Sequence, residues 1–292
     1  MITNKKLIKK KITTLNQTIN SIDKKYILPC LYHGVALTFH TDNKQFYDEL
    51  NTYLPRSWKT NTRGINIYIS SFTELDFDIN TWSNEESQDC FIENNYIIQR
   101  DFAAIKFAEN KISLIIEEII CDGLFNFLRW YLPLELMKVD KLILHSSCIL
   151  DKESLAHFFL GHSGAGKTTI TELSHPRVIL GDDMNLLSHH NDKIYAQAGA
   201  IGGLFKPQVN YDDQFTIKSF NWIIQSDENK RVELSISQAR TKLMASVSNI
   251  FWDSITDEQT DYIFNSVLKA LESIPMYELH FKKDSSFWSL IE

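Results

Sequence analysis

The chain lacks the cysteine patterns that mark disulfide-stapled or zinc-binding proteins. Its four cysteines, at positions 30, 90, 121 and 148, form no CxxC pair and no spacing typical of metal ligands. We interpret them as buried free thiols, which are common in proteins of reducing compartments. We therefore expect a cytoplasmic protein.

Long apolar runs and an excess of positive charge are also missing. No stretch is apolar enough for a membrane-spanning helix, and no apolar run of signal-peptide length follows the five lysines among the first twelve residues. We interpret this start as a solvated amphipathic helix, with a role at a membrane surface or a partner as the alternative. The formal net charge of −7 does not indicate the positively charged surface that nucleic-acid binding needs. We expect neither a membrane span nor a nucleic-acid partner.

The remaining composition, with 43% hydrophobic and 23% charged residues, is typical of a globular protein with a sizeable core. Period-2 alternation predicts strands and 3.6-residue periodicity predicts helices. The expected strands are residues 35–39, 65–69, 96–107, 111–116, 142–150, 155–160, 178–180 and 277–281. The expected helices are residues 5–19, 45–54 (ended by Pro55), 122–138, and a last one opened by a capping box of Thr256 and Gln259. The core face of that last helix should carry Ile263, Phe264, Val267, Leu268 and Leu271.

The fold class indicated is therefore mixed α/β. No internal repeat, low-complexity segment or obvious linker divides the chain. The strands of the first third carry no catalytic constellation. We expect a strand-rich α/β N-terminal portion, residues 1–138, and a P-loop nucleotide-binding domain, residues 139–292. The boundary is soft and also allows one compact unit.

A phosphate-binding loop is the strongest signal in the sequence. Residues 161–168, GHSGAGKT, fit G-x-x-x-x-G-K-[ST] at every fixed position. Ordinary residue frequencies give about 0.01 such matches by chance in a chain of this length. Glycines let backbone N–H groups approach phosphate oxygens, and the start of the following helix adds further N–H groups. The alternative is a glycine turn without a ligand.

Each residue type in this loop has a chemical reason. Lys167 supplies a point charge to the β- and γ-phosphates, and the Thr168 hydroxyl is suited to coordinate Mg²⁺. The predicted nucleotide-binding residues are Gly161, His162, Ser163, Gly164, Ala165, Gly166, Lys167, Thr168 and Thr169.

Two acids and a histidine flank the loop in the chain. Asp182 and Asp183 follow an apolar strand only fifteen positions after Lys167, where one could hold a metal and the other could accept a proton from an attacking hydroxyl. His145 lies in the preceding strand, which should neighbour the loop's strand, so its ring could reach the acids or the metal. A solvated turn and a packed side chain are the alternatives for the acids and for His145. His189 and His190 are interpreted as surface loop.

Three blocks, His145-Ser-Ser-Cys, residues 161–169 and Leu180-Gly-Asp-Asp, resemble the nucleotide-binding core shared by ATP-dependent phosphoenolpyruvate carboxykinase and HPr kinase/phosphorylase. The likeness covers residues 144–187 and is greatest to the small HPr-kinase-like proteins associated with peptide modification. Residues 274–281 and 287–288 are loosely similar to the latter. The resemblance implies a mixed central sheet of this type, metal contacts from His145 and Asp183, and Asp182 as the base.

The resemblance implies an ATP-dependent kinase that transfers the γ-phosphoryl group to a Ser or Thr hydroxyl of a peptide or protein. Lys167, Asp182 and His145 would be its catalytic residues, with Thr168 and Asp183 on Mg²⁺ or Mn²⁺. The alternatives are a non-catalytic nucleotide-dependent switch and a small carboxykinase-type lyase, although the chain is short for a carboxykinase and shows no arginine clamp for oxaloacetate. HPr kinases are oligomers, so the resemblance also allows a homo-oligomer. Residues 199–203 with Lys206 are a plain turn or a substrate loop, and we favour the turn.

Overall fold

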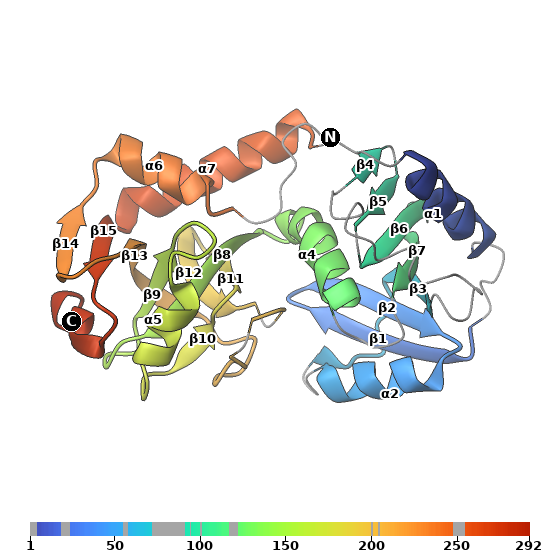
Figure 1. Cartoon of the computed structure of the whole chain (residues 1–292), viewed down its shortest axis with the longest axis horizontal. Coiled ribbons are helices and arrows are strands. Elements are labelled where there is room, and N and C mark those ends of the chain that lie inside the picture. The colour runs from blue at the N-terminus through green and yellow to red at the C-terminus, as the bar shows by residue number, and fades with distance from the viewer. Residues whose placement is uncertain are drawn as a thin grey trace. The chain divides into compact units, whose positions relative to one another are not determined.

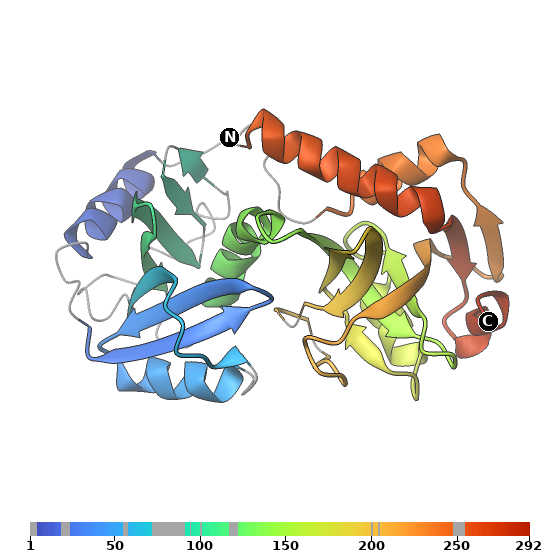
Figure 2. The same cartoon turned by 180° about the vertical axis from the view of Figure 1, so that it is seen from behind.

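The computed structural model describes residues 5–18, 24–54, 58–71, 91–93, 95–99, 101–116, 122–199, 201–203, 205–247 and 255–292. The chain divides into two compact units, Met1–Tyr131 and Leu132–Glu292, here called the N-terminal and C-terminal units (Figures 1 and 2). Each unit combines helices with a sheet that contains both parallel and antiparallel pairs, so the expected mixed α/β class is confirmed. Among the described residues, no helix is long and apolar enough to cross a membrane.

In the N-terminal unit, the described strands form one sheet in the order β1-β2-β3-β7-β6-β5-β4. The pairs β2–β3 and β3–β7 are parallel, and the others are antiparallel. The strands are β1 (Tyr26–Tyr32), β2 (Val35–Thr41), β3 (Ile65–Ser71), β4 (Phe91–Glu93), β5 (Tyr96–Ile98), β6 (Phe102–Ala108) and β7 (Lys111–Ile116). The single strand expected over residues 96–107 is therefore wrong, because the chain turns back between β5 and β6, which pair with each other.

Two helices pack on this sheet, α1 (Lys5–Thr18) on β5–β7 and α2 (Lys44–Tyr53) on β1 and β2 (Figure 1). Leu15 of α1 is fully buried with Ile105 and Ile115, and Ile12 packs against the same cluster, which anchors this lysine-rich helix. The Asn43 side chain accepts the first free backbone N–H groups of α2. Both helices were expected; residue 19 and Pro55 lie outside the described residues. So do Cys90 and Cys121, whereas Cys30 and Cys148 are buried free thiols as expected.

In the sheet of the C-terminal unit, two strands, β8 and β13, each pair with three others. Its described strands follow the order β10-β8-β11-β12-β13-β15-β14, and β9 pairs with both β8 and β13. The pairs β8–β11, β11–β12, β12–β13, β13–β9 and β9–β8 thus form a closed circuit. The strands are β8 (Lys141–Leu150), β9 (Ala156–Leu160), β10 (Ile179–Gly181), β11 (Met184–His190), β12 (Lys193–Ala198), β13 (Phe215–Gln225), β14 (Lys230–Glu233) and β15 (Met276–Phe281).

Helices cover the two faces of this sheet. Phe158 and Phe220 pack on one side with α6 (Ile236–Met244) and α7 (Asp257–Ser273), while Phe159 packs on the other with α5 (Lys167–Leu173) and the 3-10 helix η5 (Ser285–Leu290). Central strands buried on both faces explain the nearly continuous apolar run of β9. Helix α4 (Asp122–Met137), expected from its periodicity, contains the division between the units.

Helix α7 confirms one expectation and corrects another. The Thr256 side chain accepts from the Gln259 N–H, and the Thr256 N–H donates to Gln259 Oε1, so the capping box is present. However, Phe264 and Leu268 are 43% and 37% exposed. The buried stripe is narrower than expected and includes Ser266 and Ala270, small residues that the pattern did not select.

Substitution of a buried phenylalanine should destabilise the protein more than substitution of an exposed one. We expect Phe159→Ala to lower the free energy of unfolding by about 3–5 kcal/mol, because the side chain is completely buried and its removal leaves a cavity. Phe264→Ala is the matched control and should cost about 1 kcal/mol or less. Urea unfolding monitored by circular dichroism measures both values, and equal costs would contradict the assigned packing.

Candidate functional site

The middle of β8 lies beside both other sequence blocks. On one side, Ser146 pairs with Leu160, the last residue of β9 before the phosphate loop. On the other side, Cys148 pairs with Gly181 and His145 pairs with Met184, so Asp182 and Asp183 lie next to the same stretch. The expectation that the His145 strand neighbours the loop's strand is confirmed. Three segments separated in sequence therefore meet at one place in the sheet.

The sheet splits at this place. Ser146 has β9 as its neighbour, whereas the residue before it, His145, donates its backbone N–H to Ser246 O at 2.8 Å, beyond the end of α6. Leu144 likewise bridges to Val247. The chain after Leu160 leaves the sheet where the neighbours of β8 diverge.

Two glycines give the loop its shape. Gly164 and Gly166 have φ values of 78° and 103°, which side chains rarely tolerate. A Cβ at Gly166 would lie 2.9 Å from Cζ of Phe281. Gln225 Nε2 donates to the Gly164 carbonyl at 3.3 Å. The loop is thus held against β13 and β15, while His162, Ser163 and Gly164 remain exposed.

Lys167 reaches back across this loop. Its Nζ donates to the carbonyl oxygens of Gly161 (2.9 Å) and His162 (3.1 Å), although the residue is only 7% exposed. Burial lowers the pKa of the Lys167 ammonium, and the nearby Asp183 carboxylate opposes that shift. The cation therefore sits at the centre of the loop, with partners it can exchange for phosphate oxygens.

Helix α5 is fastened to β8 by hydroxyl groups. Ser147 Oγ donates to the Lys167 carbonyl at 3.0 Å, and Thr171 Oγ1 lies 3.0 Å from Ser147 Oγ. All three side chains are buried, whereas Thr168 and Thr169 at the start of the helix are half-buried. This role of Ser147 was missed from the sequence, although the residue stands in the quoted His145–Cys148 block.

The two acids have different surroundings. Asp182 is 5% exposed, and its Oδ1 accepts the Phe205 backbone N–H at 3.2 Å. A Cβ at Gly203, whose φ is 79°, would lie 2.1 Å from this Oδ1. A Cβ at Gly199 would lie 1.9 Å from Met184 O. Gly203 therefore packs directly on the acid pair, and Gly199 packs on Met184, the residue that follows it.

Asp183 faces the histidine. Its Oδ1 lies 3.4 Å from His145 Nε2, and its carbonyl accepts the Ser146 N–H at 2.8 Å. The Asp183 side chain is 19% exposed and that of His145 is 44% exposed. The expected reach of the His145 ring to the acids is confirmed for Asp183, and both side chains are partly exposed.

Side chains from two other elements complete the surroundings of the loop. The His162 ring packs edge-on against Trp222 of β13, with ring centroids 4.9 Å apart. Lys242 of α6 places its Nζ 4.4 Å from the Trp222 ring and 3.7 Å from a Glu278 oxygen. Neither Trp222 nor Lys242 belongs to any local motif, so no sequence signal could have found them.

The donor set suits magnesium rather than a closed metal cage. Within the described ranges, no group of three or more His, Cys, Asp or Glu side chains is placed to hold a metal ion. Mg²⁺ commonly uses one or two carboxylates together with substrate phosphates and water. Asp183 and the half-buried Thr168 are consistent with that pattern.

A buried Asp151–His157–Ser219 array has the connectivity of a hydrolase triad, with distances of 3.0 and 2.8 Å. Ser219 Oγ also accepts from Arg231 Nη2 and Asn221 Nδ2, both at 2.9 Å, so its lone pairs are occupied. His157 and Ser219 are 0% and 1% exposed. Because no substrate could reach this serine, the array is structural.

No known protein-family model matches the chain, and a search of curated proteins returned no match.

The buried histidine generates a pH-dependent prediction. Burial lowers the pKa of His157 from its usual 6.5, and Asp151 only partly opposes this shift. The unfolded chain therefore binds this proton more readily, so the contribution of His157 to stability is complete above about pH 6.5 and declines as the pH falls. We expect the free energy of unfolding to decrease between about pH 7 and pH 5, and to decrease less in His157→Gln.

Urea denaturation at both pH values tests this. The Asp151 carboxyl does not interfere, because its lowered pKa confines its effect to more acidic solutions. Other buried histidines change the unfolding free energy of both proteins equally with pH, so their contribution cancels in the comparison. An identical pH dependence in the two proteins would contradict the assignment.

Proposed function

We propose that the chain is an ATP- and Mg²⁺-dependent kinase that transfers the γ-phosphoryl group to a hydroxyl, namely a Ser or Thr of a peptide or protein. The observation that carries this proposal is the meeting of the phosphate loop, the acid pair and His145 around the middle of β8. The likeness of the same three blocks to the HPr kinase and phosphoenolpyruvate carboxykinase core supports it. A P-loop core of that type is part of the proposal.

The nucleotide would lie on residues 161–169. Backbone N–H groups of the loop bind the phosphate oxygens, and the Lys167 ammonium exchanges its carbonyl partners for the β- and γ-phosphates. The exchange is favourable because the cation is already desolvated and preorganised. His162, held by Trp222, limits the freedom of the loop.

Thr168 and Asp183 would hold the metal. Bound Mg²⁺ neutralises charge on the phosphates, and this is the chemistry it supplies. His145 orients the Asp183 carboxylate through the 3.4 Å contact. Asp183 also stabilises the Lys167 charge, so these groups act as one electrostatic unit.

Asp182 would accept the proton of the attacking hydroxyl. Its Oδ1 is positioned by the Phe205 N–H, and the missing side chain at Gly203 leaves the backbone close beside that oxygen. The 199–203 segment therefore borders the base, and we propose that the acceptor binds along it. A carboxylate whose proton acceptance is needed only in the transition state contributes roughly 10²–10⁴-fold to rate.

The test follows phosphate from γ-labelled ATP to a library of peptides containing a single Ser or Thr. Asp182→Asn should lower transfer roughly 100-fold or more while nucleotide binding is retained. Lys167→Met should weaken ATP binding itself. Glu153→Gln, an exposed acid before β9 at the opposite end of that strand from the loop, is the matched control and should leave both unchanged.

Different outcomes separate the alternatives. Undiminished phosphoryl transfer by Asp182→Asn would contradict the assignment of Asp182 as the base. Tight ATP binding by the unaltered protein without any transfer would favour the nucleotide-dependent switch. ATP-dependent release of CO₂ from oxaloacetate would favour the carboxykinase-type lyase. Absence of ATP binding would overturn the proposal as a whole.

A further inference from the structure

A polar pocket of about 370 Å³ lies at the far end of β11 from the acid pair. Strand β11 begins at Met184 and ends at His190, and seven strand residues span roughly 20 Å. The pocket is therefore separate from the phosphate loop. His189 and His190, interpreted from the sequence as surface loop, are instead the last residues of this strand, and His189 is half-buried.

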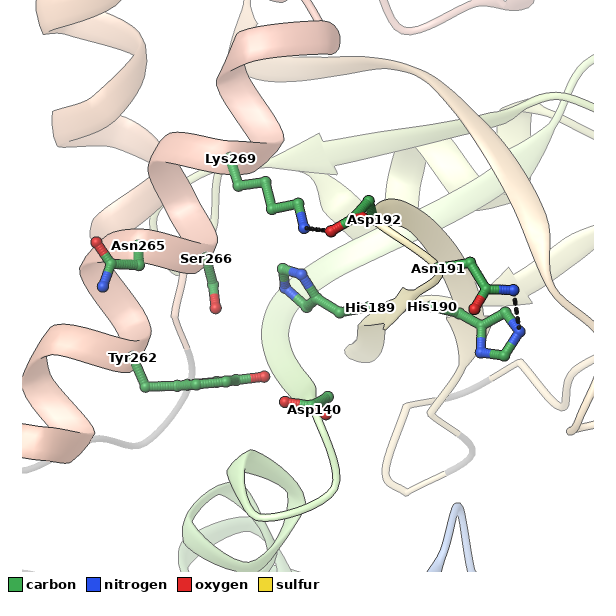
Figure 3. A pocket seen from close by; sticks show the side chains of 9 residues that line it. All are labelled: Asp140, His189, His190, Asn191, Asp192, Tyr262, Asn265, Ser266 and Lys269. Carbon is green, nitrogen blue, oxygen red and sulfur yellow. Dashed lines mark hydrogen bonds and ion pairs between the residues drawn. The ribbon is translucent and has the colours of Figure 1, made fainter.

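Three elements of the C-terminal unit supply its walls (Figure 3). Tyr262, Ser266 and Lys269 project from one face of α7, at helical spacings of four and three residues. They face His189 and the turn at Asp192, while Asp140 borders the pocket from the approach to β8. Asn191, Asp192 and Asp140 all have positive φ values, so the rim has a defined shape.

Two buried polar atoms line this pocket without satisfying each other. His189 Nε2 has no hydrogen-bond partner among the described residues, Tyr262 Oη interacts with the Ser266 side chain, and the two rings lie 6.2 Å apart. Leaving such atoms unpaired costs free energy, and native proteins do so rarely. The unpaired His189 nitrogen and the remaining acceptor capacity of Tyr262 Oη therefore indicate a ligand that donates hydrogen bonds to both.

The charges of the lining decide the sign of that ligand. Lys269 Nζ lies 3.1 Å from Asp192 Oδ1, so these two charges balance. Asp140 has no ion-pair partner among the described residues, and its charge acts on both His189 and Tyr262. Burial and Lys269 lower the pKa of His189, which keeps the ring neutral near pH 7. The lining therefore carries one unbalanced negative charge.

We propose that this pocket binds a small organic ammonium ion, whose three N–H groups are shared among the Asp140 carboxylate, Tyr262 Oη and His189 Nε2. An anion would be repelled by Asp140, whose charge no ion pair among the described residues neutralises, whereas Lys269 is already paired with Asp192. A metal ion is disfavoured because Asp192, the second carboxylate of the lining, is already paired with Lys269. The site is independent of the kinase proposal and needs no nucleotide.

Calorimetric titration of the whole chain in phosphate buffer, free of amine buffers, tests this proposal. The probes are n-butylamine and 1,4-diaminobutane, with n-butanol and butyrate as neutral and anionic analogues. At least one amine should saturate a single site, and neither analogue should. Saturation by no amine, or equal binding of n-butanol, would overturn the proposal; the latter would assign the pocket to hydroxyl compounds.

Variants locate the site and separate binding from folding. Asp140→Asn and Tyr262→Phe should each weaken amine binding roughly tenfold or more, because each removes a partner of a charged donor. Glu272→Gln, an exposed acid on α7 outside the pocket, is the matched control and should bind normally.

Without ligand, Tyr262→Phe should change the melting temperature by no more than about 4 °C, because among the described residues the hydroxyl it removes interacts only with the Ser266 side chain. Wild-type affinity in both pocket variants would place amine binding elsewhere and overturn the proposal.

Discussion

The pairing of residues 145–148 of β8 with two different partners is the constraint on which the site depends. This stretch has the end of β9 on one side and the segment around Asp182 and Asp183 on the other. A slip of one residue would turn every side chain of β8 to the opposite face. Ser147 would then lose the carbonyl of Lys167, and His145 would lose Asp183. The register of one strand therefore sets both the loop anchor and the acid contact.

That register is itself fixed by packing on both faces of the sheet. Cys148 and Leu150 belong to the core under α6 and α7, whereas Ile149 belongs to the core under α5. Since a shift would exchange these two apolar sets, the cores enforce the register. The hydroxyl of Ser147 is the polar exception on the α5 side, and its hydrogen bonds to the start of the helix make its burial tolerable.

The features predictable from the sequence are those whose physics is local. The glycine spacing of the phosphate loop, the capping box at Thr256 and the apolar run of β9 each act within a few residues, and each has the expected conformation. Contacts set by distant elements were missed. Trp222 beside the loop and the narrow buried stripe of α7 depend on which strands and helices become neighbours. Hydrophobic periodicity does not encode that choice.

The two ends of β11 favour ligands of opposite charge. Near Met184, a buried ammonium, Lys167, is stabilised by carbonyl oxygens and by Asp183, so a phosphate ligand replaces weak partners with stronger ones. At His190, the cation Lys269 is already paired, and Asp140 is the charge left unbalanced among the lining residues. An anion is therefore favoured at the first end and a cation at the second. A rigid strand between them keeps the two fields roughly 20 Å apart, well beyond the screening length of about 8 Å at physiological salt. Each site can then be altered without changing the charge balance of the other.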